Sequence, residues 1–123
     1  MRENDNKFLA WLEFCAEKVN AMEAEAAKLQ AAGDDEAHKD ALLDKAAFIA
    51  RLAREGQTYL LGLDDPVREF AKKNIGAFSE SADWALKLKS YANMSSLLYS
   101  DEHQPGAPNL LSRFLEEMRG KLA

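Results

Sequence analysis

Few side chains in this sequence are suited to metal binding or proton transfer. Asp35 and His38 have the spacing of the carboxylate–histidine pairs in di-iron bundles, but such a site needs two pairs and two further carboxylates from facing helices. This chain has one such pair, so we expect no bound metal and no cofactor. We expect His38 to lie at the edge of a helical seam near Leu29. The other histidine, His103, falls in a polar stretch and is expected to be solvated.

The single cysteine, Cys15, has no histidine placed to activate it, and a nucleophilic thiol needs a neighbouring base. Cys15 recurs with apolar residues at helical spacing, so we expect a buried, unreactive thiol. The sequence has no glycine-rich phosphate loop, no Gly-x-Ser-x-Gly elbow and no Cys-x-x-Cys pair. The carboxylates of Glu13, Glu17, Glu23 and Glu25 are expected on the outer face of a helix. We therefore expect no catalytic residues.

Two stretches of the chain carry apolar residues at alternating spacings of four and three, which is the pattern of paired α-helices. The first set is Phe8, Leu12, Cys15, Val19, Met22, Ala26 and Leu29. The second set is Leu42, Ala46, Ile49, Ala53, Gly56, Leu60 and Leu63. Between the two sets, Gly33 can end one helix and Asp34 can cap the next. The pattern predicts a long antiparallel helical hairpin.

The first helix of this hairpin is expected over residues 5–32, with Asn4 or Asp5 as its cap. The second is expected over residues 35–61, with Gly62 as its stop.

Glycine costs about 1 kcal/mol inside a helix, which makes Gly56 the weak point of the second helix. The apolar spacing nevertheless continues in phase through Gly56. We therefore predict one continuous helix in which Gly56 packs opposite Trp11 or Leu12, where a missing side chain admits a large one. A break at Gly56 is the alternative.

In the second half of the chain, two aspartates followed by Pro66 are a strong start signal for a helix over residues 66–99. A glycine and two serines leave a break over residues 76–81 as an open alternative. The proline-containing stretch 100–108 is expected to be a loop, and residues 109–121 are expected to form a final amphipathic helix.

The expected fold is therefore all-α, a single domain over residues 1–123 with a bundle of four main helices built on the hairpin. The bulky residues of the hairpin, 8–19 and 48–60, lie at its open end. Later helices should pack there and leave the turn end thinner and more exposed.

The composition narrows the classes of partner. The chain is 47% hydrophobic and 30% charged, with a net charge of −5, and no segment is net basic. Binding to a nucleic-acid backbone needs clustered positive charge, so a nucleic-acid partner is not favoured.

The sequence also bears on where the protein is found. The first seven residues lack the apolar core of a signal peptide, and no run approaches the roughly 20 apolar residues of a membrane span. A lone cysteine fits a reducing compartment. We expect a cytoplasmic protein without a membrane partner.

A strong helical framework without visible chemistry is typical of an interaction protein. We predict a non-catalytic helical module for protein–protein interaction, such as an adaptor, a chaperone or an accessory subunit, that forms a homodimer. Most aromatic residues are assigned to the core. The candidate interaction surface consists of Leu9, Phe14, Leu29 and His38, and the exposed turn end is a candidate for a further working surface.

Two other classes of function remain open. A small subunit of a nucleic-acid-binding complex would use a basic face formed by Arg51, Arg54, Arg68, Lys72 and Lys73, extended by Lys87 and Lys89. A small-molecule carrier or an enzyme would need a site between helices.

Overall fold

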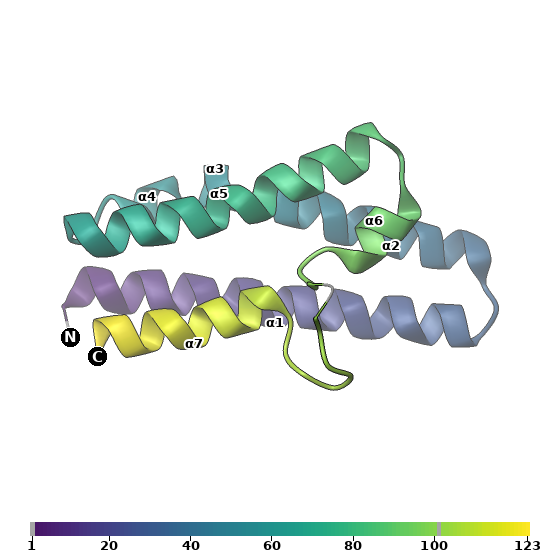
Figure 1. Cartoon of the computed structure of the whole chain (residues 1–123), viewed down its shortest axis with the longest axis horizontal. Coiled ribbons are helices and arrows are strands. Elements are labelled where there is room, and N and C mark those ends of the chain that lie inside the picture. Colours follow the sequence, from purple (N-terminus) through teal and green to yellow (C-terminus); the bar gives the residue numbers. More distant parts are fainter. Residues whose placement is uncertain (1, 101) are drawn as a thin grey trace.

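The computed structural model of this chain describes residues 2–100 and 102–123, and over these residues all regular structure is helical. The all-α class predicted from the sequence is therefore confirmed. The helices are α1 (Glu3–Ala31), α2 (Asp35–Ala50), α3 (Leu52–Glu55), α4 (Gln57–Leu60), α5 (Asp65–Lys87), α6 (Tyr91–Ser96) and α7 (Leu110–Leu122). Figure 1 shows α1 and α2 side by side and joined by a tight turn, which is compatible with the predicted hairpin.

The turn between α1 and α2 uses the two residues that the sequence singled out. Gly33 has a φ of +75°, in the left-handed region that favours glycine. The Asp34 carboxylate accepts a 3.2 Å hydrogen bond from the backbone N–H of Ala37 and so caps α2.

The predicted start of α1, with Asn4 or Asp5 as its cap, is wrong by about two residues. The helix begins at Glu3, with Arg2 as its cap residue. Asp5 is buried within the first turn, where its carboxylate pairs with the Arg2 guanidinium at 3.3 Å and complements the positive end of the helix dipole.

The predicted continuous helix over residues 35–61 is also wrong, because the hydrogen-bond ladder is interrupted after Ala50. In a regular helix the N–H of Ala53 would donate to the carbonyl of Ile49. Here the Ser79 hydroxyl stands between them: it donates to the Ile49 oxygen at 2.8 Å and accepts from the Ala53 N–H at 2.9 Å. A side chain inserted into the ladder is a recognised cause of a helix break.

Gly56 is a packing glycine, as predicted. A Cβ atom at this position would lie 2.6 Å from the ring of Trp11, so no other residue fits without a shift. The Trp11 ring stacks on Tyr59 with 5.2 Å between centroids. The boundary between α3 and α4 also falls at Gly56, so the break considered as the alternative is present as well.

The predicted helix over residues 66–99 breaks at a different place from the one considered. α5 runs without interruption through residues 76–81, because the Ser79 hydroxyl bonds α2 and α3 instead of competing for the backbone of α5. The chain turns at 88–90, where Lys89 has a φ of +52° and the Ser90 hydroxyl caps α6 by accepting from the N–H of Asn93 at 3.1 Å.

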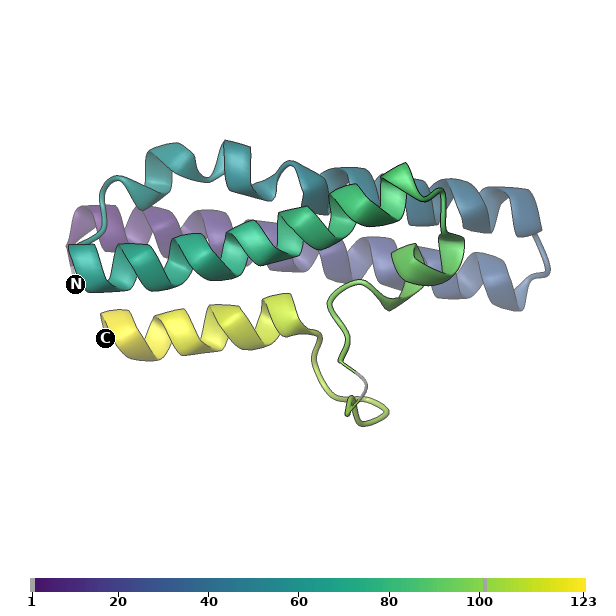
Figure 2. The ribbon, with the colours of Figure 1, turned by 45° about the horizontal axis from the view of Figure 1, so that its top comes forward.

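The last helix, α7, lies along α1 near both chain ends (Figure 1). Asn109 caps it by accepting a 2.9 Å hydrogen bond from the Ser112 N–H. Phe114 packs against Phe70 and Phe78, with ring centroids 6.1 and 5.9 Å away. Figure 2 shows α5 and α7 on the open end of the hairpin, with the turn end projecting beyond them, as the distribution of bulky residues predicted.

Candidate functional site

The four residues predicted to form an interaction surface lie at two separate places. Phe14 is 59% exposed, whereas Leu9 is partly buried against the core. Leu29 and His38 are half-buried near the turn, and the His38 Nδ1 donates a 2.9 Å hydrogen bond to the carbonyl of Ala26. Twenty residues of α1 separate Leu9 from Leu29, or about 30 Å at the helical rise, so the four side chains do not form one patch.

The predicted basic residues are partly neutralised by neighbours. Arg51 pairs with Glu55 at 3.5 Å. Arg68 pairs with Asp65 and also donates to the carbonyl of Leu63 at 2.9 Å. The remaining three, Arg54, Lys72 and Lys73, are exposed.

The residues that first suggested chemistry do not assemble into a reactive site. Cys15 is buried, and desolvation, helped by the negative charge of Glu55, raises the pKa of its thiol to about 12. His103 lies edge-on to the ring of Tyr99, with 4.6 Å between centroids. Within the described part of the chain, no three His, Cys, Asp or Glu side chains gather closely enough to hold a metal ion.

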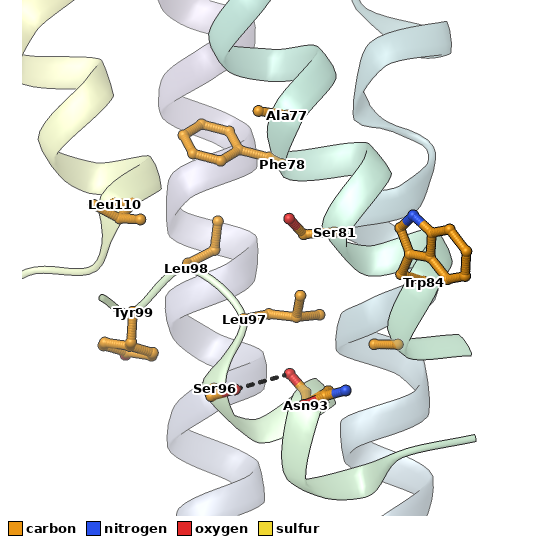
Figure 3. A pocket seen from close by; sticks show the side chains of 11 residues that line it. Ala77, Phe78, Ser81, Trp84, Asn93, Ser96, Leu97, Leu98, Tyr99 and Leu110 are labelled. Carbon is orange, nitrogen blue, oxygen red and sulfur yellow. Dashed lines mark hydrogen bonds between the residues drawn. The ribbon is translucent and has the colours of Figure 1, made fainter. Parts of the chain in front are cut away.

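A groove of about 460 Å³ lies between α5, α6 and the segment that leads into α7. Leu97 and Leu98 are buried in its floor, and Ser81 and Trp84 are exposed on its α5 side. Figure 3 shows Trp84 on one side of the groove and Leu110 on the other, with Leu97 between them.

An exposed stripe on α5 borders this groove. Ala77, Ser81, Trp84 and Leu88 are spaced by four, three and four residues, so they share one face of the helix. The Trp84 side chain is 56% exposed and Leu88 is 61% exposed. Tyr91, which begins α6, is a further exposed aromatic at 38%. The prediction that most aromatic residues belong to the core therefore does not hold for Trp84 and Tyr91.

A buried polar network holds the groove segment on the hairpin. The Lys45 ammonium is fully enclosed, lies 3.0 Å from the Glu23 carboxylate, and donates to the carbonyls of Ser95 and Leu97 at 3.2 and 3.3 Å. Lys45 thereby satisfies the carbonyls at the end of α6 and neutralises Glu23. The expectation that Glu23 faces solvent is wrong, because this carboxylate is the shared partner of the network.

The other oxygen of Glu23 accepts hydrogen bonds from the Tyr99 hydroxyl at 2.9 Å and from the Asn109 amide at 2.8 Å. Asn109 also donates to Asn20 at 3.0 Å. Burial, followed by the hydrogen bond to Glu23 and its charge, raises the pKa of Tyr99 to about 12. These contacts fix both ends of the segment between α6 and α7.

Sequence reasoning missed these features, although two signals were present. Lys45 falls within the apolar positions of α2, beside Leu42 and Ala46, where a charge needs a buried partner. On α5, the stripe through Trp84 lies on a different face from the core stripe through Ile75 and Ala82. A helix with two apolar faces has more apolar surface than its own core requires.

None of the helices in the described residues combines the length and the apolar character needed to cross a bilayer. Comparison of the chain with protein-family models, with curated proteins and with solved structures gave no match.

Proposed function

We propose that this protein is a non-catalytic module for protein–protein interaction and that its working surface is the groove together with the α5 stripe. The observation that carries the proposal is the exposure of Trp84 at the rim of a groove whose floor is apolar. Tryptophan is among the residues that contribute most at protein interfaces. Covering the exposed part of one such ring removes enough apolar area to contribute roughly 3 kcal/mol.

The chemistry of the groove supports binding rather than catalysis. Its polar lining consists of hydroxyl and amide groups from Ser81, Asn93, Ser96 and Tyr99. The Tyr99 hydroxyl, whose pKa is raised to about 12 by burial and by Glu23, is protonated at neutral pH. The lining residues include no carboxylate, imidazole or amine that could act as a general acid or base near pH 7.

Site-specific photocrosslinking tests the proposal. A photoreactive residue at Ser81, in the groove, is compared in cells with one at Ala24, which is exposed on α1. We expect Ser81 to yield a discrete protein adduct that Ala24 does not yield. Trp84→Ala should abolish this adduct, whereas Phe14→Ala, a change at a similarly exposed aromatic, should leave it intact.

Two results would contradict the proposal. One is the absence of any adduct specific to Ser81. The other is an adduct that persists in the Trp84→Ala variant, because the groove would then not depend on its exposed ring.

A further inference from the structure

We infer that the partner of this surface is a second copy of the same chain, an inference that rests on the proposed function. The C-terminal halves of α5 from two copies would pack antiparallel about a twofold axis. Each copy would place Trp84 at the groove of the other. A twofold interface of this kind requires a surface that is complementary to itself.

The sizes of the side chains in the stripe meet this requirement. The small residues, Ala77 and Ser81, come first along α5, and the large ones, Trp84 and Leu88, follow. In an antiparallel pair centred between Ser81 and Trp84, the small half of each stripe meets the large half of the other. Ala77 and Ser81 also line the groove, so the space next to them is open to the partner's Trp84.

The charges beside the stripe are complementary in the same arrangement. Glu80 and Lys87 are seven residues apart, about two helical turns, and therefore lie along the same edge of the stripe. When a twofold axis relates two antiparallel helices, this edge of one helix lies against the same edge of the other, with the residues in reverse order. Glu80 then lies within about two residues, or about 3 Å along the helix, of the partner's Lys87 at two symmetric positions. Asp83, on the outer side of that edge, adds negative charge about five residues further along from the partner's Lys87.

These charges have no ion-pair partner within residues 2–100 and 102–123. Neither Glu80, Asp83 nor Lys87 forms a salt bridge there, and the Lys87 ammonium instead lies 5.5 Å from the centre of its own Trp84 ring. All three side chains are exposed. They are therefore available to a second chain without breaking an ion pair of the first, although Lys87 would leave its position over the Trp84 ring.

The apolar area sets the expected strength of the dimer. The exposed parts of Trp84, Leu88 and Tyr91 amount to roughly 300 Å² per copy, from their exposed fractions and the size of such side chains. Doubling this area and adding a polar rim gives an interface near the lower end of specific complexes. We therefore expect a dimer that dissociates on dilution.

The inference can be tested by sedimentation equilibrium on the full chain over a range of concentrations. The unmodified chain is compared with variants in which one charge is reversed. We expect the unmodified chain to fit a monomer–dimer equilibrium. Glu80→Lys alone and Lys87→Glu alone place like charges opposite each other, and each should weaken the dimer about tenfold or more. An equimolar mixture of the two variants restores opposite charges at both positions, so it should form a heterodimer about as stable as the original. Trp84→Ala should weaken the dimer about thirtyfold or more.

Glu25→Lys and Lys28→Glu provide the matched control, because both residues are exposed on α1 and the same charges change. Neither variant should alter the dimer. A dimer that survives Trp84→Ala, or a mixture that does not recover, overturns the inference. A strict monomer also overturns it, but the proposed function then stands if Ser81 still yields an adduct with a different protein, and falls if it does not.

Discussion

Lys45 and Glu23 form a buried ion pair that joins α2 to α1, with 3.0 Å between the ammonium and the carboxylate. Their side chains are only 2% and 17% exposed, so water screens the interaction weakly. The same two groups bond the end of α6 and the residues that flank the loop before α7. This pair therefore positions the wall of the groove from inside the molecule.

Lys45→Met should lower the free energy of unfolding by about 3–5 kcal/mol, because it leaves a largely enclosed carboxylate without its cation. Adding Glu23→Gln should recover part of this loss, since the glutamine oxygen can still accept from Tyr99 and Asn109. Urea denaturation measures both variants, with the exposed Lys73→Met expected to stay within about 0.5 kcal/mol of the parent. Equal destabilisation in the single and double variants would show that the pair does not act as a unit.

Ser79→Ala should destabilise the chain by about 1–3 kcal/mol, because the N–H of Ala53 and the carbonyl of Ile49 lose the hydroxyl that joins them. Hydrogen exchange at the Ala53 amide should accelerate in the same variant. Ser95→Ala is the control, since this exposed serine offers Lys45 its carbonyl and not its side chain. Unchanged hydrogen exchange at the Ala53 amide would mean that this N–H finds another hydrogen-bond acceptor when the Ser79 hydroxyl is absent.

Gly56→Ala and Gly76→Ala should shift stability in opposite directions. At Gly56 the new methyl group would meet Trp11, and we expect a loss of about 1–3 kcal/mol. At Gly76, inside α5, the space around the Cβ is open, so we expect a gain of about 0.5–1 kcal/mol. Thermal unfolding measures both. A gain in stability for the Gly56→Ala variant would show that the Trp11 ring can move aside at little cost.

Ionisation of Cys15 should favour unfolding above about pH 9. Burial raises the thiol pKa from 9.0 to about 12 in the folded chain, so the unfolded chain loses this proton first as the pH rises. The stabilising contribution is complete below pH 9 and is lost between about pH 9 and 12. Cys15→Ala should therefore show a shallower fall of stability over that interval.

The folded thiol should also react slowly with a disulfide reagent. At pH 8 its thiolate fraction is about a thousandfold lower than in the unfolded chain, from tenfold per pKa unit. Labelling of the native chain at the rate measured in guanidinium would show that Cys15 is accessible.

The turn between α1 and α2 was predicted correctly because it depends on residues close together in the chain. Gly33 and Asp34 act on their own neighbours, so the turn could be read from local signals. The break after Ala50 could not, because Ser79, almost thirty residues away, inserts into the ladder. The packing of Gly56 against Trp11 was predictable because the seam fixes which residues face each other across α1 and the helix after the turn.

The candidate site was harder to predict for a related reason. From its spacing alone, Trp84 would be assigned to the core. Which of the two apolar faces of α5 is covered depends on the path of α5 and on the position of α6. Lys45 donates hydrogen bonds to carbonyls about fifty positions later in the chain, and no local pattern predicts that contact. The residues selected in its place were Leu9, Phe14, Leu29 and His38. They were chosen by their position in or beside the seam, which does not determine what later helices cover.

Amide chemical shifts recorded during dilution test the central claim most directly, namely that the groove and the α5 stripe bind a second copy. We predict concentration-dependent shifts confined to residues 77–91 and 93–99, and their disappearance in the Trp84→Ala variant. Shifts centred on Phe14, or spectra that do not change over the concentrations at which the chain sediments as a dimer, would contradict the account.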